Sequence, residues 1–325
     1  MSEALMDHAT QTIAVGSKSF AAAARLFDPA TRRSVLMLYA WCRHCDDVVD
    51  GQELGFNTAP SPTHDAARQL ALLDELTRRA YAGDTMRDPA FAAFQEVAMR
   101  HAIAPEHAFD HLAGFAMDVH ETRYDTIDDT LRYCYHVAGV VGLMMARIMG
   151  AQDARVLDRA CDLGMAFQLT NIARDIVEDA HVGRCYVPAA WLREAGIPPD
   201  ELALPRHRAA LARVAARLVD YAEPYYASAT HGIADLPLRS AWAIATARNV
   251  YRQIGIEVKR RGAHAWDERA GTTRATKLRL LAKGGMNALS SRVRTAPPPR
   301  AGLWQRPQRP DGTAAPRHAA HATAA

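Results

Sequence analysis

The stretch "QLTNIARDIVEDA", Gln168–Ala180, carries three oxygen-bearing side chains, Asn171, Asp175 and Asp179, at intervals of four residues. The residues around them favour a helix and are partly apolar. An α-helix turns about 100° per residue, so these side chains and Gln168 fall within about 80° of one face. Exposed helix faces usually mix acids with bases at this spacing, because like charges four residues apart repel. The stretch therefore predicts a helix with a polar strip that is not an ordinary solvent-exposed face.

A second polar strip is predicted on a helix that begins at Pro29 and ends near Gly51. Asp28 suits the N-cap position, and proline is favoured at the first helical position. Four side chains fall within about 60° of one face of this helix, namely Tyr39, Arg43, Asp46 and Asp50. The apolar run "VLMLYAWC" leads into this strip. Both helices are therefore expected to turn carboxylates towards the interior.

Buried carboxylates are costly unless they are paired or bind a metal ion. Oxygen ligands suit Mg²⁺, which typically binds one or two carboxylates and completes its shell with water and substrate phosphates. Two facing strips could thus hold a diphosphate through bridging Mg²⁺ ions, with Mn²⁺ as a substitute. Arg43 and Arg174, one beside each strip, could bind the remaining phosphate oxygens. One strip alone could equally be a set of core salt bridges or helix caps, but two matched strips favour the metal site.

The rest of the chain predicts an all-α fold. Helical patterns occur near residues 64–82, 89–102, 105–121, 126–149, 153–182, 206–231, 237–262 and 272–293. Short connections with Pro, Gly or Asp join them, and there is no repeat and no convincing strand. We expect one helical domain over residues 1–295. Residues 296–325, rich in Pro, Ala and Arg and without periodicity, are predicted to be a disordered tail.

Composition indicates a globular protein, with 49% hydrophobic and 23% charged residues. Residues 259–325 carry 14 Lys or Arg and 3 Asp or Glu, whereas residues 1–258 carry 25 and 33. The basic end is either a solvated tail or a surface for anionic lipid; we expect no nucleic-acid partner. There is no secretory signal and no apolar run long enough to span a bilayer. Five cysteines suggest free thiols in a reducing cytoplasm.

The segment "YCYHVAGVVG", residues 133–142, supplies an apolar face. Tyr133, Val137 and Val141 share this face, and taken alone the face is better explained by plain core packing than by a ligand site. A di-iron carboxylate site needs Glu-x-x-His on each of two helices. Only Glu178–His181 has that spacing, so the di-iron alternative is excluded.

Several of these segments together resemble the head-to-head isoprenoid synthases, the family of phytoene, dehydrosqualene and squalene synthases. The resemblance covers residues 10–290 and lies in "SKSF" (17–20), "YAWCRHCDDVVD" (39–50), "YCYHVAGVVG" (133–142), "GMAFQLTNIARDIVED" (164–179) and "GRCYVP" (183–188). The form of the second acidic segment is most similar to bacterial phytoene synthases. The resemblance implies a helical bundle with a central cavity.

The resemblance also implies roles for individual residues. Asp46, Asp50, Asn171, Asp175 and Asp179 would bind Mg²⁺. Tyr133, Tyr39, Arg43 and Arg174 would serve in catalysis. Substrate would contact Ser17, Lys18, Ser19, Phe20, Tyr39, Arg43, Val137, Val141, Gln168, Arg174, Tyr251 and Arg269. The reaction implied is the condensation of two geranylgeranyl diphosphates through a cyclopropyl diphosphate to a C40 triene.

Four alternatives stay open at this stage. A farnesyl-specific enzyme would make a C30 product; the small residues Ala21 to Ala24, expected to line the pocket, favour C20 chains. A squalene synthase would also need NADPH, which we do not expect. Chain elongation would need a second D-D-x-x-D motif, and "NIARDIVED" does not provide one. An inactive scaffold would not need intact acidic strips. We expect a monomeric cytoplasmic enzyme in peripheral contact with membrane lipid.

Overall fold

A computed structural model describes residues 6, 9–13, 18–51, 65–293 and 298–307. These residues form helices and connections, and no strand occurs among them. The α-helices are α2 (Lys18–Ala24), α3 (Pro29–Asp50), α4 (Ala66–Ala82), α5 (Pro89–Arg100), α6 (Pro105–Val119), α7 (Ile127–Cys134), α8 (Val140–Ile148), α9 (Ala154–His181), α10 (Ala189–Glu194), α11 (Arg208–Thr230), α12 (Leu238–Arg261) and α13 (Arg274–Ser290). The predicted all-α fold is confirmed.

Helix ends follow the capping residues in the sequence. Asp28, Asp88 and Asp153 accept backbone N–H bonds at the starts of α3, α5 and α9. Gly51 and Gly83 end α3 and α4 in the left-handed conformation, which glycine adopts without a steric penalty. The short helix α10 was not predicted, because six residues are too few to show a helical period.

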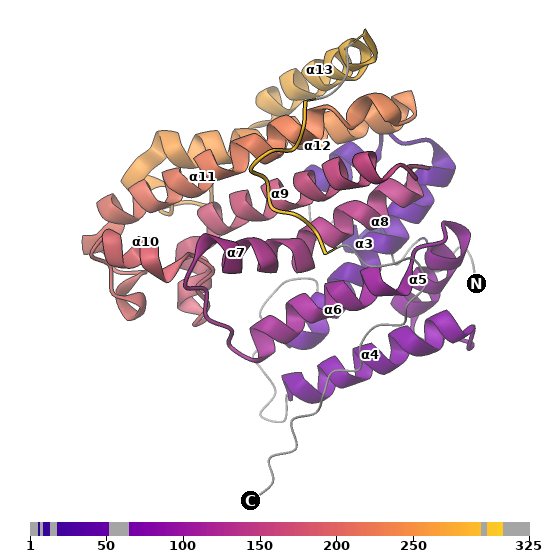
Figure 1. Cartoon of the computed structure of the whole chain (residues 1–325), viewed down its shortest axis with the longest axis horizontal. Coiled ribbons are helices and arrows are strands. Elements are labelled where there is room, and N and C mark those ends of the chain that lie inside the picture. Colours follow the sequence, from indigo (N-terminus) through magenta and orange to yellow (C-terminus); the bar gives the residue numbers. More distant parts are fainter. Residues whose placement is uncertain (1–5, 7–8, 14–17, 52–64, 294–297, 308–325) are drawn as a thin grey trace, which may run out of the picture.

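Helix α9 lies at the centre of the bundle (Figure 1). Helices α11 and α12 pack on one side of it, with α13 outermost against α12. Helix α8 packs on α9 from the other side, and α3, α6, α5 and α4 continue the bundle beyond it. The core is rich in alanine and aliphatic side chains, and Trp41 is completely buried within it.

Glycines allow α9 to approach α8 and the turn before α8 very closely. A Cβ added to Gly142 would overlap the backbone carbonyl of Ala160 on α9. A Cβ added to Gly164 would overlap the carbonyl oxygen of Ala138 and would lie 2.9 Å from the Gly139 Cα. Glycine at these positions is therefore required by the backbone contact.

The predicted helix over 126–149 is interrupted by a π-helical turn, η1 (Tyr135–Gly139). The backbone N–H of Val140 donates to the carbonyl of Tyr135, which widens this turn by one residue. Tyr133 precedes the turn, Val137 lies within it and Val141 follows it. All three residues line the same cavity.

Residues 298–307 cross the bundle in front of α12, α11 and α9 (Figure 1) and are called the strap. Arg300 forms an ion pair with Asp162, whose side chain is completely buried in α9. The Trp304 ring packs 5.2 Å from that of Tyr135, and the backbone N–H of Trp304 donates to the Tyr225 hydroxyl. The placed strap differs from the disordered tail expected from residue 296. A few single contacts hold the strap in place, and such contacts leave no periodic pattern in the sequence. Residues 308–325 of that expected tail lie outside the described residues.

Candidate functional site

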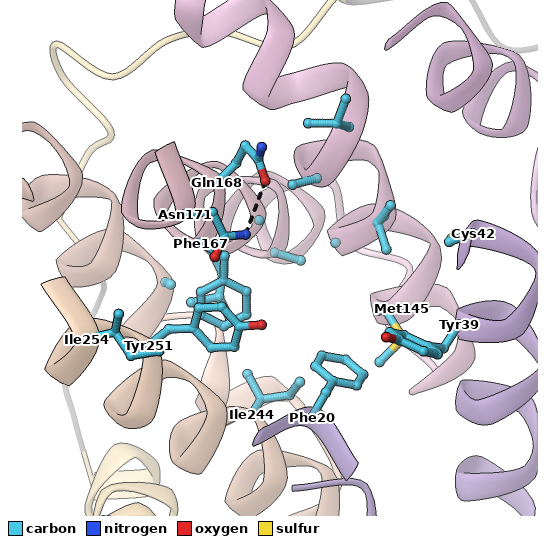
Figure 2. A pocket seen from close by; sticks show the side chains of 18 of the residues that line it. Phe20, Tyr39, Cys42, Met145, Phe167, Gln168, Asn171, Ile244, Tyr251 and Ile254 are labelled. Carbon is cyan, nitrogen blue, oxygen red and sulfur yellow. Dashed lines mark hydrogen bonds between the residues drawn. The ribbon is translucent and has the colours of Figure 1, made fainter. Parts of the chain in front are cut away.

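A cavity of about 1020 Å³ runs through the bundle between α3 and α9. Figure 2 shows Phe20 and Tyr39 on one side of the open space and Phe167, Asn171 and Tyr251 on the other. Twelve of the residues proposed from the sequence line this cavity, namely Phe20, Tyr39, Arg43, Asp46, Tyr133, Val137, Val141, Gln168, Asn171, Arg174, Tyr251 and Arg269. The central cavity expected from the sequence is therefore confirmed.

Other proposed residues have different positions. Ser17 lies outside the described residues, as do the side chains of Lys18 and Ser19. Among the described side chains of α2, only Phe20 lines the cavity; Ala24 is buried but is not part of the cavity wall. The expectation that Ala21 to Ala24 line the pocket is therefore wrong for the cavity that the structure describes. The remaining acids, Asp50, Asp175 and Asp179, are not part of the cavity wall, but Arg184, which pairs with Asp50, and Arg174, which pairs with Asp175, do line the cavity.

The strip on α3 contains two acids, and each acid has an arginine partner. Arg43 lies one turn before Asp46 and donates to it, because residues three apart are neighbours on a helix. Asp50, one turn further, accepts two hydrogen bonds from Arg184, one of them 3.0 Å long. Burial raises the pKa of Asp46 to about 6 despite Arg43. This strip therefore carries more negative charge than its environment favours.

The strip on α9 has one paired and one unpaired carboxylate. Burial alone would raise the pKa of Asp175, but Arg174 and Arg269 lower it by hydrogen bonding and by charge. The Nε of Arg174 lies 2.7 Å from Asp175, and Arg269 donates from a distant loop at 2.9 Å. Asp179 forms no ion pair with any described basic side chain, and burial and the Asp175 charge raise its pKa to about 7.

Arg184 links the two strips. It donates to Asp50 on α3, and its charge offsets part of the rise in the pKa of Asp179 on α9, so it lies near both. Arg184 belongs to the segment "GRCYVP", but no role for it was predicted from the sequence. Its position directly after the acidic helix was the available signal. The two strips thus meet around one arginine at the polar end of the cavity.

The donor set at this end fits Mg²⁺. Carboxylate and amide oxygens are its preferred ligands, and the Asn171 Oδ1 is buried without a hydrogen-bond partner. Among the described residues, no three His, Cys, Asp or Glu side chains converge enough to hold an ion by themselves. That arrangement suits ions that complete their shell with phosphate oxygens. Four arginines that pair with these acids also line the cavity, namely Arg43, Arg174, Arg184 and Arg269.

The rest of the cavity is mostly apolar. Phe20 and Tyr39 stack with ring centroids 5.9 Å apart, and Phe167 and Tyr251 stack at 4.2 Å on the opposite side. The far end is lined by aliphatic and small residues, including Met145, Met149, Val156, Gly232, Ile233 and Leu236. A long hydrocarbon chain would be buried here with its charged end among the arginines.

Two further polar residues beside the cavity, Asp118 and Tyr186, were not predicted from the sequence. Asp118, near the end of α6, accepts hydrogen bonds from Tyr133 at 3.1 Å and from Tyr186 at 3.0 Å. Asp118 is 15 residues from Tyr133 and 68 from Tyr186 in sequence. No local spacing could have joined these three residues.

The chain matches known proteins over most of its length. Residues 13–279 match the family described as squalene/phytoene synthase. The 15-cis-phytoene synthase of Pantoea ananas is 64% identical over 93% of this chain and 98% of that protein. The 15-cis-phytoene synthase of Paracoccus sp. is 50% identical over 92% of this chain and 96% of that protein.

Among solved structures, a dehydrosqualene synthase in complex with a ligand superposes with a TM-score of 0.79 at 25% identity. The superposition covers 89% of this chain and 98% of that one. The squalene synthase of Alicyclobacillus acidocaldarius gives a TM-score of 0.69 at 25% identity, with 80% and 95% of the two chains covered.

Proposed function

The chain belongs to the squalene/phytoene synthase family, and we propose that it joins two geranylgeranyl diphosphates head to head into phytoene and releases diphosphate. The observation that carries this proposal is the cavity, with arginines and acids at one end and an apolar interior. A volume of about 1020 Å³ lies at the upper end for small-molecule sites. Relatives named phytoene synthase, 64% identical over almost their whole length, support the C40 product.

Several residues would act directly in this reaction. Arg43, Arg174 and Arg269 would bind diphosphate oxygens, exchanging their present carboxylate partners for phosphate. Asp46, Asp50, Asn171, Asp175 and Asp179 would hold Mg²⁺ or Mn²⁺. When bound, the metal supplies Lewis-acid neutralisation of the departing diphosphate.

The interior would protect and steer the allylic cation. Aromatic faces such as Tyr39 and Tyr133 stabilise a desolvated cation by about 2 kcal/mol. The apolar walls exclude water, which would otherwise quench the cation. Val137 and Val141 would contact the hydrocarbon chains from η1 and α8.

The decisive experiment is an assay of purified protein with Mg²⁺ and radiolabelled C15 or C20 diphosphate, without NADPH. We expect a C40 triene from the C20 substrate in the lipid extract. A C30 product alone would instead support the farnesyl-specific alternative, and a product formed only with NADPH would support squalene synthesis. Consumption of isopentenyl diphosphate would indicate chain elongation.

The proposed metal site can be tested by thermal stability, without measuring turnover. Mg²⁺ together with inorganic diphosphate should raise the melting temperature by several degrees, because both bind only the folded site. A hundredfold excess over the dissociation constant corresponds to about 3 kcal/mol. Mg²⁺ alone should do much less, since phosphate oxygens complete its shell. Thermal shift with and without EDTA checks this, and the same shift in Asp175→Asn protein would contradict the assigned site.

We also propose that the enzyme works in the cytoplasm, as a monomer in peripheral contact with a membrane, through one face of α13. Leu278, Met286 and Leu289 are 67%, 64% and 60% exposed. They lie within about 80° of one helix face. Lys277, Arg279 and Lys283 on the same helix would attract anionic lipid. No described helix is both long and apolar enough to cross a bilayer.

The membrane proposal predicts the effect of a triple substitution. Replacing Leu278, Met286 and Leu289 with serine should abolish co-sedimentation with anionic vesicles, because their apolar contact with the acyl region is lost. The melting temperature should change little, since these side chains are exposed in the folded protein. Zwitterionic vesicles serve as the control for charge, and undiminished binding by the triple variant would exclude this face.

A further inference from the structure

Asp118 occupies an unusual place in the cavity wall. It lies on the last turn of α6 and lines the cavity together with Tyr133 and Arg184. Its two carboxylate oxygens have separate partners: Oδ2 accepts the hydroxyl of Tyr133 and Oδ1 that of Tyr186. Neither partner is a cation, so this is a charged group held by two phenols.

The tyrosines around Asp118 form a rigid cluster. The rings of Tyr133 and Tyr186 stack with centroids 4.4 Å apart, and Tyr124 packs against both at 5.5 and 5.7 Å. All three rings are at most 7% exposed. Of the three tyrosines, only Tyr133 lines the cavity, as Asp118 does, and its hydroxyl donates to that carboxylate at the cavity wall.

This cluster lies close to the polar end, where diphosphate would leave. Arg184 holds Asp50, and its positive charge acts on Asp118 and lowers the pKa of that carboxyl. Burial has the larger opposing effect and raises the pKa of Asp118 to about 6. At neutral pH Asp118 is therefore mostly ionised yet holds a proton more tightly than an exposed aspartate.

We propose that Asp118 accepts, through Tyr133, the proton lost when the cyclopropane ring closes in the first half of the reaction. The inference rests on the proposed function. A C–H bond beside the cation breaks, and its electron pair forms the C–C bond that closes the ring. The proton passes to the Tyr133 oxygen as the Tyr133 hydroxyl proton moves to Asp118 Oδ2. The ring closes while the second diphosphate is still attached to the substrate. This diphosphate keeps the reacting carbons near the polar end of the cavity.

Asp118 is thus a positioning residue that acts through Tyr133, and Tyr133 is the group that touches substrate. Two alternatives lead to different results when Asp118 is replaced. If released diphosphate takes the proton, the loss of Asp118 would not affect the rate. If Asp118 serves only to hold the tyrosines in the fold, both halves of the reaction would suffer together.

The test compares Asp118→Asn with Tyr186→Phe in the full-length protein. Asparagine keeps an acceptor oxygen but cannot take a proton at neutral pH. Formation of phytoene from geranylgeranyl diphosphate should fall about 10²- to 10⁴-fold, the range typical of a lost general base. Conversion of prepared cyclopropyl diphosphate, which bypasses the first proton loss, should stay within about threefold. Tyr186→Phe removes one hydrogen bond to the same carboxylate and should cost less than about tenfold.

A deuterium label at the carbon that loses the proton provides a second measurement. In Asp118→Asn protein the labelled substrate should react more slowly than the unlabelled one, with a larger isotope effect than in the original protein. Equal losses in both half-reactions, or no loss in either, would overturn the proposal. If the original protein makes no C40 hydrocarbon, the proposed function fails instead, and the two failures are thereby distinguished.

Discussion

Replacing Asp179 with asparagine is expected to lower kcat/KM by about 10³-fold or more, because the variant lacks one of the proposed metal ligands at the departing diphosphate. Metal ions supply several kcal/mol of transition-state stabilisation, and about 4 kcal/mol corresponds to this factor. Steady-state kinetics with geranylgeranyl diphosphate measures the loss. Glu178→Gln is the matched control, because Glu178 is adjacent on α9 but is exposed and off the strip. It should keep activity within about threefold, since exposed pairs contribute little.

The same Asp179→Asn substitution should stabilise the metal-free protein. The pKa of Asp179 is raised to about 7 in the folded state, above the ordinary value of 3.8. The folded protein therefore binds this proton more tightly than the unfolded chain, and stability falls as the pH rises from about 4 to 7. Asparagine does not ionise, so the variant does not lose this stability. The melting temperature of the variant should exceed that of the original protein above pH 7 and match it near pH 4. An equal or lower value at pH 8 would contradict the raised pKa.

Gly164→Val is expected to destabilise the bundle by more than about 3 kcal/mol, or to prevent folding. The new side chain would meet the Ala138 carbonyl and the Gly139 Cα, which are backbone atoms and cannot rotate away. Denaturant unfolding or the yield of soluble protein measures the effect.

Gly285→Ala on α13 is the control for the glycine prediction. Its added Cβ would lie 3.4 Å from the nearest atom, Trp242 Nε1, at the edge of ordinary contact. Alanine favours a helix by up to about 1 kcal/mol over glycine, so this variant should be as stable as the original or more so. Similar losses in both variants would show that the close approach of η1 to α9 is not the cause.

Much of the fold could be predicted from local sequence patterns. Aspartate N-caps, proline at first positions and glycine at ends mark helix boundaries through contacts within one turn. The two polar strips were also predictable, because the helical period places their members on one face. Of the strip residues, Tyr39, Arg43, Asp46, Gln168 and Asn171 line the cavity. Other lining residues, such as Phe20 and Tyr251, were expected from the family resemblance and not from helical periodicity.

What could not be predicted depends on contacts between distant segments. Asp118 meets Tyr133 and Tyr186 only because α6 ends beside them, and its own helix gives no sign of that. The pairing of Arg269 with Asp175 likewise joins residues 94 apart. The π-helical turn η1 appeared in the sequence as part of a regular helix, since one added residue hardly changes an apolar pattern.

The strap has a consequence for how the protein is made. Ribosomes synthesise a chain from its N-terminus, so Asp162 is made long before Arg300, which follows 138 residues later. Until then Asp162 has the hydrogen bond from Ser228 but lacks its ion-pair partner Arg300, and a buried charge without its partner costs about 3–5 kcal/mol. The bundle can therefore reach its final packing only after Arg300 has been made, and nascent chains stalled before Arg300 should remain open to protease.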